Sequence, residues 1–106
     1  MANRFDEDLG VVTESKTKPK LQKPPMYKVL MHNDHYTTRE FVVEVLTHVF
    51  RHSEVEAIQI MMHVHQKGVG VAGIYPHDVA ETKIHLVEQM ARENEFPLRL
   101  TMEPED

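Results

Sequence analysis

Residues 27–50, with the sequence YKVLMHNDHYTTREFVVEVLTHVF, decide the fold because they hold a strand, a turn and a helix in succession. The apolar run at residues 27–31 predicts a strand. Thr37, followed three residues later by Glu40, has the pattern of a capping box, which predicts a helix that begins there and runs to about Phe50. The apolar residues of this helix recur at helical spacing. They are Val42, Val45, Leu46 and Val49.

Another helix and another strand follow by the same reasoning. Ser53 and Glu56 form a second capping box, and the helix that they begin is predicted to run to about Gln66, because Gly68 stops it. Residues 69–75 are β-rich but interrupted by glycine, which predicts a strand with a bulge or a close approach to another segment.

A third helix is predicted from Pro76 to about Asn94, because apolar residues share one of its faces and Pro97 breaks any continuation. Residues 98–103 alternate as a closing strand. The order β-α-α-β-α-β predicts a single small α+β domain with three helices packed on a three-stranded antiparallel sheet. The shared face of the third helix consists of Ala80, Ile84, Val87 and Ala91.

The composition limits the class of protein. The 106 residues suffice for one modest core, and the net charge of -5 argues against general nucleic-acid binding. The lack of cysteine excludes disulfides and thiolate chemistry. No stretch approaches the roughly 18 apolar residues of a membrane span, and the N-terminus has no apolar signal core. These features predict a cytoplasmic protein that binds neither nucleic acid nor membrane.

The first 25 residues are predicted to form a flexible extension. An acidic patch at residues 6–8 precedes a stretch rich in lysine and proline, and such a sequence cannot bury enough surface to offset its ordering entropy. Residues 1–25 are therefore expected to precede a core domain at residues 26–106. The extension is either a passive leader or a segment that acts on a partner.

Polar residues are candidates for a binding site next to the first strand and on the second helix. Asn33 and Asp34 are common turn formers, but they can equally accept hydrogen bonds from a cationic ligand. His65 is expected at the edge of the core face, either as a core histidine or as an acceptor toward a pocket. The methionines beside it are either plain core or an adaptable wall for apolar side chains. This stripe consists of Ile58, Met61, Met62 and His65.

The eight histidines raise the question of a metal site. His48 and His52 are expected one helical turn apart and could share an ion, whereas His63 and His65 point about 200° apart. No H-E-x-x-H motif is present, and zinc usually takes three or four protein ligands. A metal-dependent enzyme is thus the weaker alternative, and we predict no metal, cofactor or catalytic residue.

Several motifs stand in a distinctive order and spacing, namely residues 23–30, 33–37, 40–42, 64–68, 80–83 and 92–98, together with Met61. They resemble the core of the bacterial ClpS family over about residues 24–104. The resemblance implies a non-enzymatic adaptor of the N-end rule pathway. Such an adaptor binds the N-terminal Phe, Tyr, Trp or Leu of substrate proteins and delivers them to a Clp unfoldase such as ClpA or ClpC.

The resemblance also implies roles for individual residues, and it matches the extension to the segment that acts on the unfoldase during delivery. The residues implied to hold the substrate's α-amino group are Asn33, Asp34, His35 and His65. Those implied to line the side-chain pocket are Thr37, Arg39, Met61, Met62, Val64 and Leu98. Asp78 and Lys83 match positions that contact the unfoldase.

Three residues depart from the family's usual Asn-Asp-Asp-Tyr-Thr-Pro-Met. His35 replaces an acid, which should weaken ammonium binding, more so in mild acid where an imidazole becomes charged. Thr38 replaces a proline, a minor loss. Arg39 replaces a methionine that guards the pocket against β-branched residues, so we expect a shift toward aromatic residues and less exclusion of Ile or Val. The alternative is a domain that docks on the unfoldase but no longer binds N-termini.

Overall fold

The computed structural model describes residues 23–106, and its elements follow the predicted order. The predicted extension, residues 1–25, falls almost wholly outside the described residues, so its boundary stays a prediction. The elements are β1 (Met26–His32), α1 (Arg39–His48), α2 (Glu54–Lys67), β2 (Val69–Pro76), α3 (His77–Glu93) and β3 (Arg99–Pro104).

The three strands form one antiparallel sheet in the order β2-β1-β3, as the sequence predicted. The bulge expected in the glycine-interrupted strand is present, because the register shifts between Val29 and Leu30 and leaves Ala72 of β2 without a partner on β1. His52, in the loop after α1, donates its Nε2 hydrogen to the carbonyl oxygen of Ala72 at 2.6 Å. This bond satisfies a carbonyl group at the bulge, where the ladder is interrupted.

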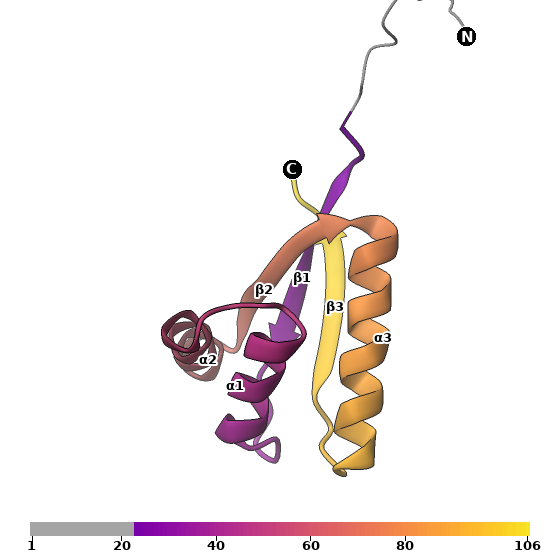
Figure 1. The fold of residues 1–106 in the computed structure, drawn as a ribbon. Coiled ribbons are helices and arrows are strands. Elements are labelled where there is room, and N and C mark those ends of the chain that lie inside the picture. Colours follow the sequence, from indigo (N-terminus) through magenta and orange to yellow (C-terminus); the bar gives the residue numbers. More distant parts are fainter. Residues whose placement is uncertain (1–22) are drawn as a thin grey trace, which may run out of the picture.

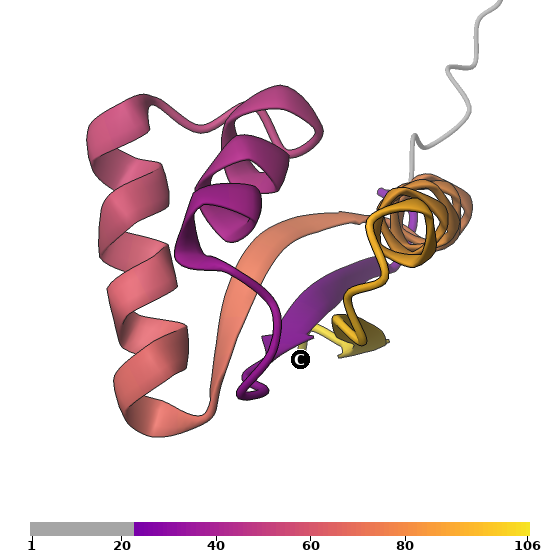
Figure 2. The same ribbon diagram turned by 90° about the horizontal axis from the view of Figure 1, so that it is seen from below.

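The three helices cover one face of the sheet (Figures 1 and 2). On this face, helix α3 lies toward the edge formed by β3, while α1 and α2 form a pair toward the opposite edge, where α2 contacts β2. The core lies between the helices and the sheet. Its largest fully buried side chains are Met31, Leu46, Val29, Val45 and Val87.

The first helix begins one residue later than the capping box predicted. Thr38, not Thr37, is the N-cap, and its hydroxyl accepts the backbone N–H of Phe41 at 3.1 Å. The hydroxyl of Thr37 donates instead to Asp34 at 2.8 Å, so it is engaged in the preceding turn. Helix α1 also ends at His48, about two residues before the predicted end.

The buried face of α2 differs from the predicted stripe. Ala57 and Val64 are buried, and Ile60 and Met61 pack partly against the core. These four residues have the same i, i+3, i+4, i+7 spacing as the predicted set, but shifted by one position. Because β2 approaches α2 closely at Gly70, the helix turns Val64 inward. The outward residues of the predicted stripe are Ile58, which is 42% exposed, and His65, which is also exposed.

The predicted bounds and inner face of helix α3 are confirmed. It begins after Pro76, and Ala80, Val87 and Ala91 are buried on its inner face. Within residues 23–106, no helix combines the length and the apolar character needed to cross a membrane.

Candidate functional site

The turn that follows β1 is tied to the end of α2. The backbone N–H of Asn33 donates to the carbonyl oxygen of Gly68 at 2.9 Å. Gly68 ends α2 with a φ of 90°, a left-handed conformation that glycine adopts without strain. This bond holds the Asn33–Asp34 turn beside the last turn of α2, which carries His65. Residues from two distant parts of the sequence therefore meet at one end of the sheet.

Asp34 organises the turn. Its Oδ1 accepts the backbone N–H groups of Tyr36 at 2.8 Å and Thr37 at 2.7 Å, and its Oδ2 accepts the hydroxyl of Thr37 at 2.8 Å. Partial burial raises the pKa of the Asp34 carboxyl, but the hydrogen bonds from Thr37 and Tyr36 outweigh it, so the pKa lies below its ordinary value. Asp34 is therefore a carboxylate at neutral pH.

A small cavity lies at this turn. Its volume is about 20 Å³, which is room for about one water molecule. Three residues that the resemblance assigned to the pocket line it: Thr37, Val64 and Leu98. Asn33 and Asp34 line it as well, so polar acceptors and apolar walls share the same space.

Three lining residues were not among the predicted site residues: Met31, His32 and Val42. Met31 alternates with Val29 on the buried face of β1, and Val42 belongs to the apolar stripe of α1. Their positions were predicted, but nothing in the sequence distinguishes a cavity wall from the rest of the core. His32 is fixed by a hydrogen bond between its Nε2 and the hydroxyl of Thr101 on β3, at 2.8 Å.

The remaining pocket candidates lie elsewhere. Arg39 and Met61 line a separate, larger groove between α1 and α2, with a volume of about 380 Å³. Met62, His35 and His65 line neither of these two spaces. The groove is completed by Glu40, Val43, Glu44 and Ile58.

One contact joins the start of α1 to the last turn of α2. The Nη2 of Arg39, in the first turn of α1, lies 3.1 Å from the Nε2 of His65, in the last turn of α2. Because a guanidinium only donates, His65 accepts this hydrogen bond. Both side chains are exposed. Sequence reasoning did not predict this pair, because its members are 26 positions apart.

The two residues assigned to a partner surface lie on α3, but only one points freely outward. The Asp78 side chain is 98% exposed. The Nζ of Lys83, by contrast, donates to the carbonyl oxygen of Val49 at 2.7 Å and lies 5.2 Å from the ring centroid of Tyr75. Burial raises the pKa of Tyr75 above its ordinary value, so this ring is a neutral phenol beside the ammonium. A surface groove of about 300 Å³ is lined by Asp78, Val79, Thr82 and Lys83.

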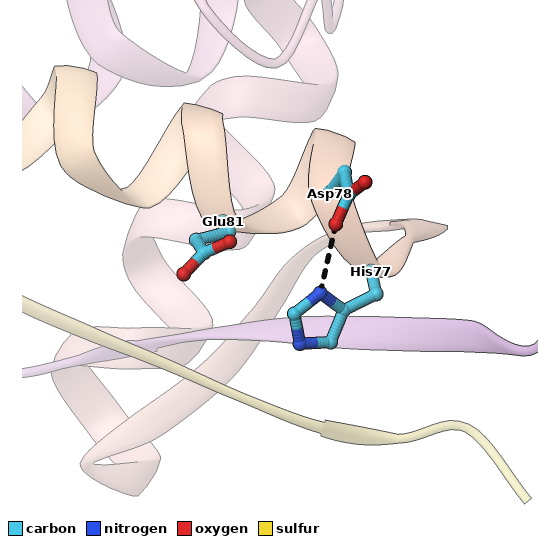
Figure 3. A group of neighbouring side chains, drawn as sticks. All are labelled: His77, Asp78 and Glu81. Atoms are coloured by element: carbon cyan, nitrogen blue, oxygen red, sulfur yellow. Dashed lines mark hydrogen bonds and ion pairs between the residues drawn. The ribbon is translucent and has the colours of Figure 1, made fainter.

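A histidine and two acids gather at the start of α3 (Figure 3). The Nδ1 of His77 lies 3.2 Å from the Oδ1 of Asp78, and the potential ligand atoms of His77, Asp78 and Glu81 all lie within 4.8 Å of one another. All three residues are exposed, and the positive end of the helix dipole opposes a cation there. The cluster therefore adds polar character to the surface around Asp78, and the absence of a metal site stays a prediction.

His48 and His52 do not face one another as expected. The Nδ1 of His48 donates to the carbonyl oxygen of Glu44 at 3.1 Å. His52 lies beyond the end of α1, where its Nε2 bonds to Ala72 and its Nδ1 lies 3.6 Å from a carboxylate oxygen of Glu56. The helix ends too early to place the two imidazoles on one face.

The fold is a small α+β domain, and its cavity combines a carboxylate and an amide with apolar walls. The family described as "ATP-dependent Clp protease adaptor protein ClpS" matches residues 22–101. The chain therefore belongs to the ClpS family of Clp protease adaptors, as the resemblance implied.

Individual relatives agree with this assignment. The ATP-dependent Clp protease adapter protein ClpS of Myxococcus xanthus is 64% identical over 106 residues, which cover 100% of this chain and 99% of that protein. The ClpS of Desulfatibacillum aliphaticivorans is 57% identical over 99 residues, or 93% of this chain and 94% of that protein. Agrobacterium tumefaciens ClpS2, solved bound to L-phenylalaninamide, is 44% identical with a TM-score of 0.75; the match covers 78% of this chain and 100% of that chain.

Proposed function

We propose that the protein binds the free N-terminal residue of substrate proteins and delivers them to the ATPase of a Clp protease. The observation that carries the proposal is the placing of Asn33 and Asp34 at a cavity walled by Val64 and Leu98, with His65 adjacent to Val64 on the same helix. An N-terminal residue has the matching chemistry, because its ammonium is one bond from the carbon that bears its side chain. Such an adaptor acts by binding and not by catalysis.

The ammonium requires acceptors and a negative charge. A carboxylate offers about four lone-pair directions, and the hydrogen bonds within the turn use three of those of Asp34. Asp34 therefore retains its charge and one acceptor direction toward a ligand. The amide oxygen of Asn33 and the imidazole of His65 supply neutral acceptors, and hydrogen bonds from a charged donor are the stronger kind. His35, exposed in the same turn, contributes no negative charge.

The side chain of the substrate residue enters the apolar part of the site. Burying a Phe or Leu side chain contributes about 1.5–3 kcal/mol. A cavity of about 20 Å³ is too small for either, so binding includes an outward movement of its walls. Met61 and Met62 lie outside this cavity, on the same helix as its wall residue Val64, and their flexible thioether side chains are suited to line the space that the movement opens.

The ligand of the Agrobacterium relative supports this assignment. L-phenylalaninamide has a free α-amino group, a phenyl side chain, and an amide where the next peptide bond of a chain would follow. It therefore has the chemistry of an N-terminal phenylalanine. We transfer this ligand class to the present chain and extend it to Tyr, Trp and Leu.

Fluorescence anisotropy of labelled peptides tests the proposal. A peptide that begins with free Phe should bind, whereas its acetylated form should not, because acetylation removes the charge and two of the three N–H donors. His65→Ala should weaken binding, because it removes a hydrogen bond to a charged group. His63→Ala is the matched control, since His63 is an exposed histidine of the same helix. Equal binding of free and acetylated peptides would contradict the proposal.

The surface around Asp78 is proposed to dock on the N-terminal domain of a ClpA-type or ClpC-type unfoldase. Its exposed carboxylate and the adjoining groove, which contains the 42% exposed Val79, offer a charged contact next to an apolar one. Lys83 is half-buried and already bonded to Val49, so we assign it mainly to the support of this surface. The extension at residues 1–25 is proposed to act during delivery, and the cytoplasm is the proposed compartment.

Calorimetric titration with the isolated unfoldase domain tests the docking surface. Asp78→Lys should abolish the binding heat while leaving the affinity for a Phe peptide unchanged, because the two sites lie on different elements. Glu93→Lys, at the other end of α3, is the matched charge reversal and should retain binding. Retained docking by Asp78→Lys would rule out this surface.

A further inference from the structure

The contact between Arg39 and His65 closes a link between the first turn of α1 and the last turn of α2. A guanidinium has five N–H donors, no acceptor, and a charge that persists throughout the ordinary pH range. At 3.1 Å, the Nε2 of His65 must therefore offer its lone pair to Arg39. In a neutral imidazole the single hydrogen then resides on Nδ1.

The substrate's ammonium also requires an unprotonated nitrogen on His65. It too is a cation that only donates. A neutral imidazole has one such nitrogen, so it accepts from one cation at a time. A change of tautomer moves the lone pair to the other nitrogen but does not create a second one.

From this exclusion we infer that Arg39 is a specificity-determining residue that competes with the substrate's ammonium for the lone pair of His65. The inference rests on the proposed function. Before a ligand can use His65, the guanidinium must leave it. The contact is exposed on both sides, so its net strength is that of an ordinary hydrogen bond, and the competition should reduce affinity about three- to tenfold.

The displaced guanidinium distinguishes ligands by the kind of side chain that they bring. Over an aromatic ring it regains part of the lost interaction through a cation–π contact, whereas an aliphatic side chain offers nothing in return. Arg39 should therefore disfavour N-terminal Leu more than N-terminal Phe.

Peptides that begin with Leu give the cleanest test, because no cation–π contact is involved. Arg39→Met should raise the affinity for a Leu peptide about three- to tenfold and the affinity for a Phe peptide by less. Arg92→Met is the matched control, since it removes the same charge from an exposed position in the last turn of α3, and it should change neither affinity. A Leu peptide that binds Arg39→Met no more tightly than the wild type would overturn the inference.

A double-mutant cycle separates competition from simple repulsion between the two cations. In a His65→Ala background, Arg39→Met should give no gain, because the lone pair that both cations seek is gone. If the same gain persists in that background, the guanidinium acts through space and the inference is wrong.

The tautomer of His65 gives a measurement without any ligand. Long-range nitrogen–proton NMR of the free wild-type protein should show a bare Nε2 and a protonated Nδ1. A wild-type spectrum with the hydrogen on Nε2 would refute the contact and with it the inference, regardless of the peptide affinities. If the contact is present but neither protein binds any free N-terminus, the proposed function fails and the competition fails with it. If the wild type binds and Arg39→Met gives no gain, only the competition fails.

Discussion

Replacing Lys83 by methionine should reduce the free energy of unfolding by about 2–3 kcal/mol. The Nζ donates at 2.7 Å to the carbonyl oxygen of Val49, the C-cap residue of α1, and lies 5.2 Å from the ring centroid of Tyr75. Methionine keeps the packing of the aliphatic stem but has no donor. A hydrogen bond from a charged group contributes about 1.5–3 kcal/mol and a cation–π contact about 0.5–1 kcal/mol. Together these contributions amount to about 2–4 kcal/mol, and because Lys83 is partly exposed we expect a value in the lower half, about 2–3 kcal/mol.

Urea denaturation followed by circular dichroism measures this effect. With a slope of about 1–3 kcal/mol per molar urea, the midpoint should fall by about 0.7–3 M. Lys67→Met, at the exposed end of α2, is the matched control and should leave the midpoint nearly unchanged. An unchanged midpoint for Lys83→Met would refute the reasoning and return Lys83 to the role of a free docking cation. A loss of unfoldase binding by a Lys83 variant can therefore be interpreted only after its stability is known.

Three further changes test the scaffold of the site. Ser53→Ala removes the N-cap of α2, whose hydroxyl accepts the N–H of Glu56 at 3.1 Å, and should lower the free energy of unfolding in urea by about 0.5–2 kcal/mol. Gly70→Ala would place a Cβ 2.8 Å from Cγ2 of Val64, so thermal denaturation should show a loss of about 1–3 kcal/mol and peptide affinity should fall with it. Asp34 has a lowered pKa in the folded state, so its carboxylate stabilises the fold at neutral pH, and this stabilisation is lost as the pH falls below its ordinary value of 3.8. Asp34→Asn should therefore be less stable than the wild type at about pH 6. The difference between their free energies of unfolding, measured in urea, should shrink as the pH is lowered to about 3.

The sequence predicted the ends of a helix correctly where the capping residues and the groups that they bond lie within a few residues of one another. Ser53 and Glu56 form the capping box that the sequence indicated, and Gly68 ends α2 in the left-handed conformation that its position indicated. The same rule failed at α1, because two threonines are adjacent and the choice between them is made by Asp34. That carboxylate engages the N–H and hydroxyl of Thr37, which leaves Thr38 to cap the helix.

The candidate site was predictable in its residue types but not in its geometry. The pairing of Asn33 with Gly68 joins segments far apart in the sequence, and no periodicity encodes such a bond. The resemblance placed Arg39 with the pocket walls, whereas its guanidinium contacts His65 and its side chain lines the neighbouring groove. The roles of these residues toward a ligand stay predictions until the peptide experiments are done.

Helix α2 connects the stability of the fold to the chemistry of the site. Val64 and His65 are consecutive, so their side chains diverge by about 100° around the helix axis. Val64 walls the cavity and His65 does not line it, and the rotation of the helix sets both positions at once. The close approach of Gly70 to Val64 fixes that rotation, and it does so one position away from the stripe that hydropathy alone favoured. The exposure of His65 thus follows from the packing of its neighbour, and that exposure brings it within reach of a guanidinium or an ammonium.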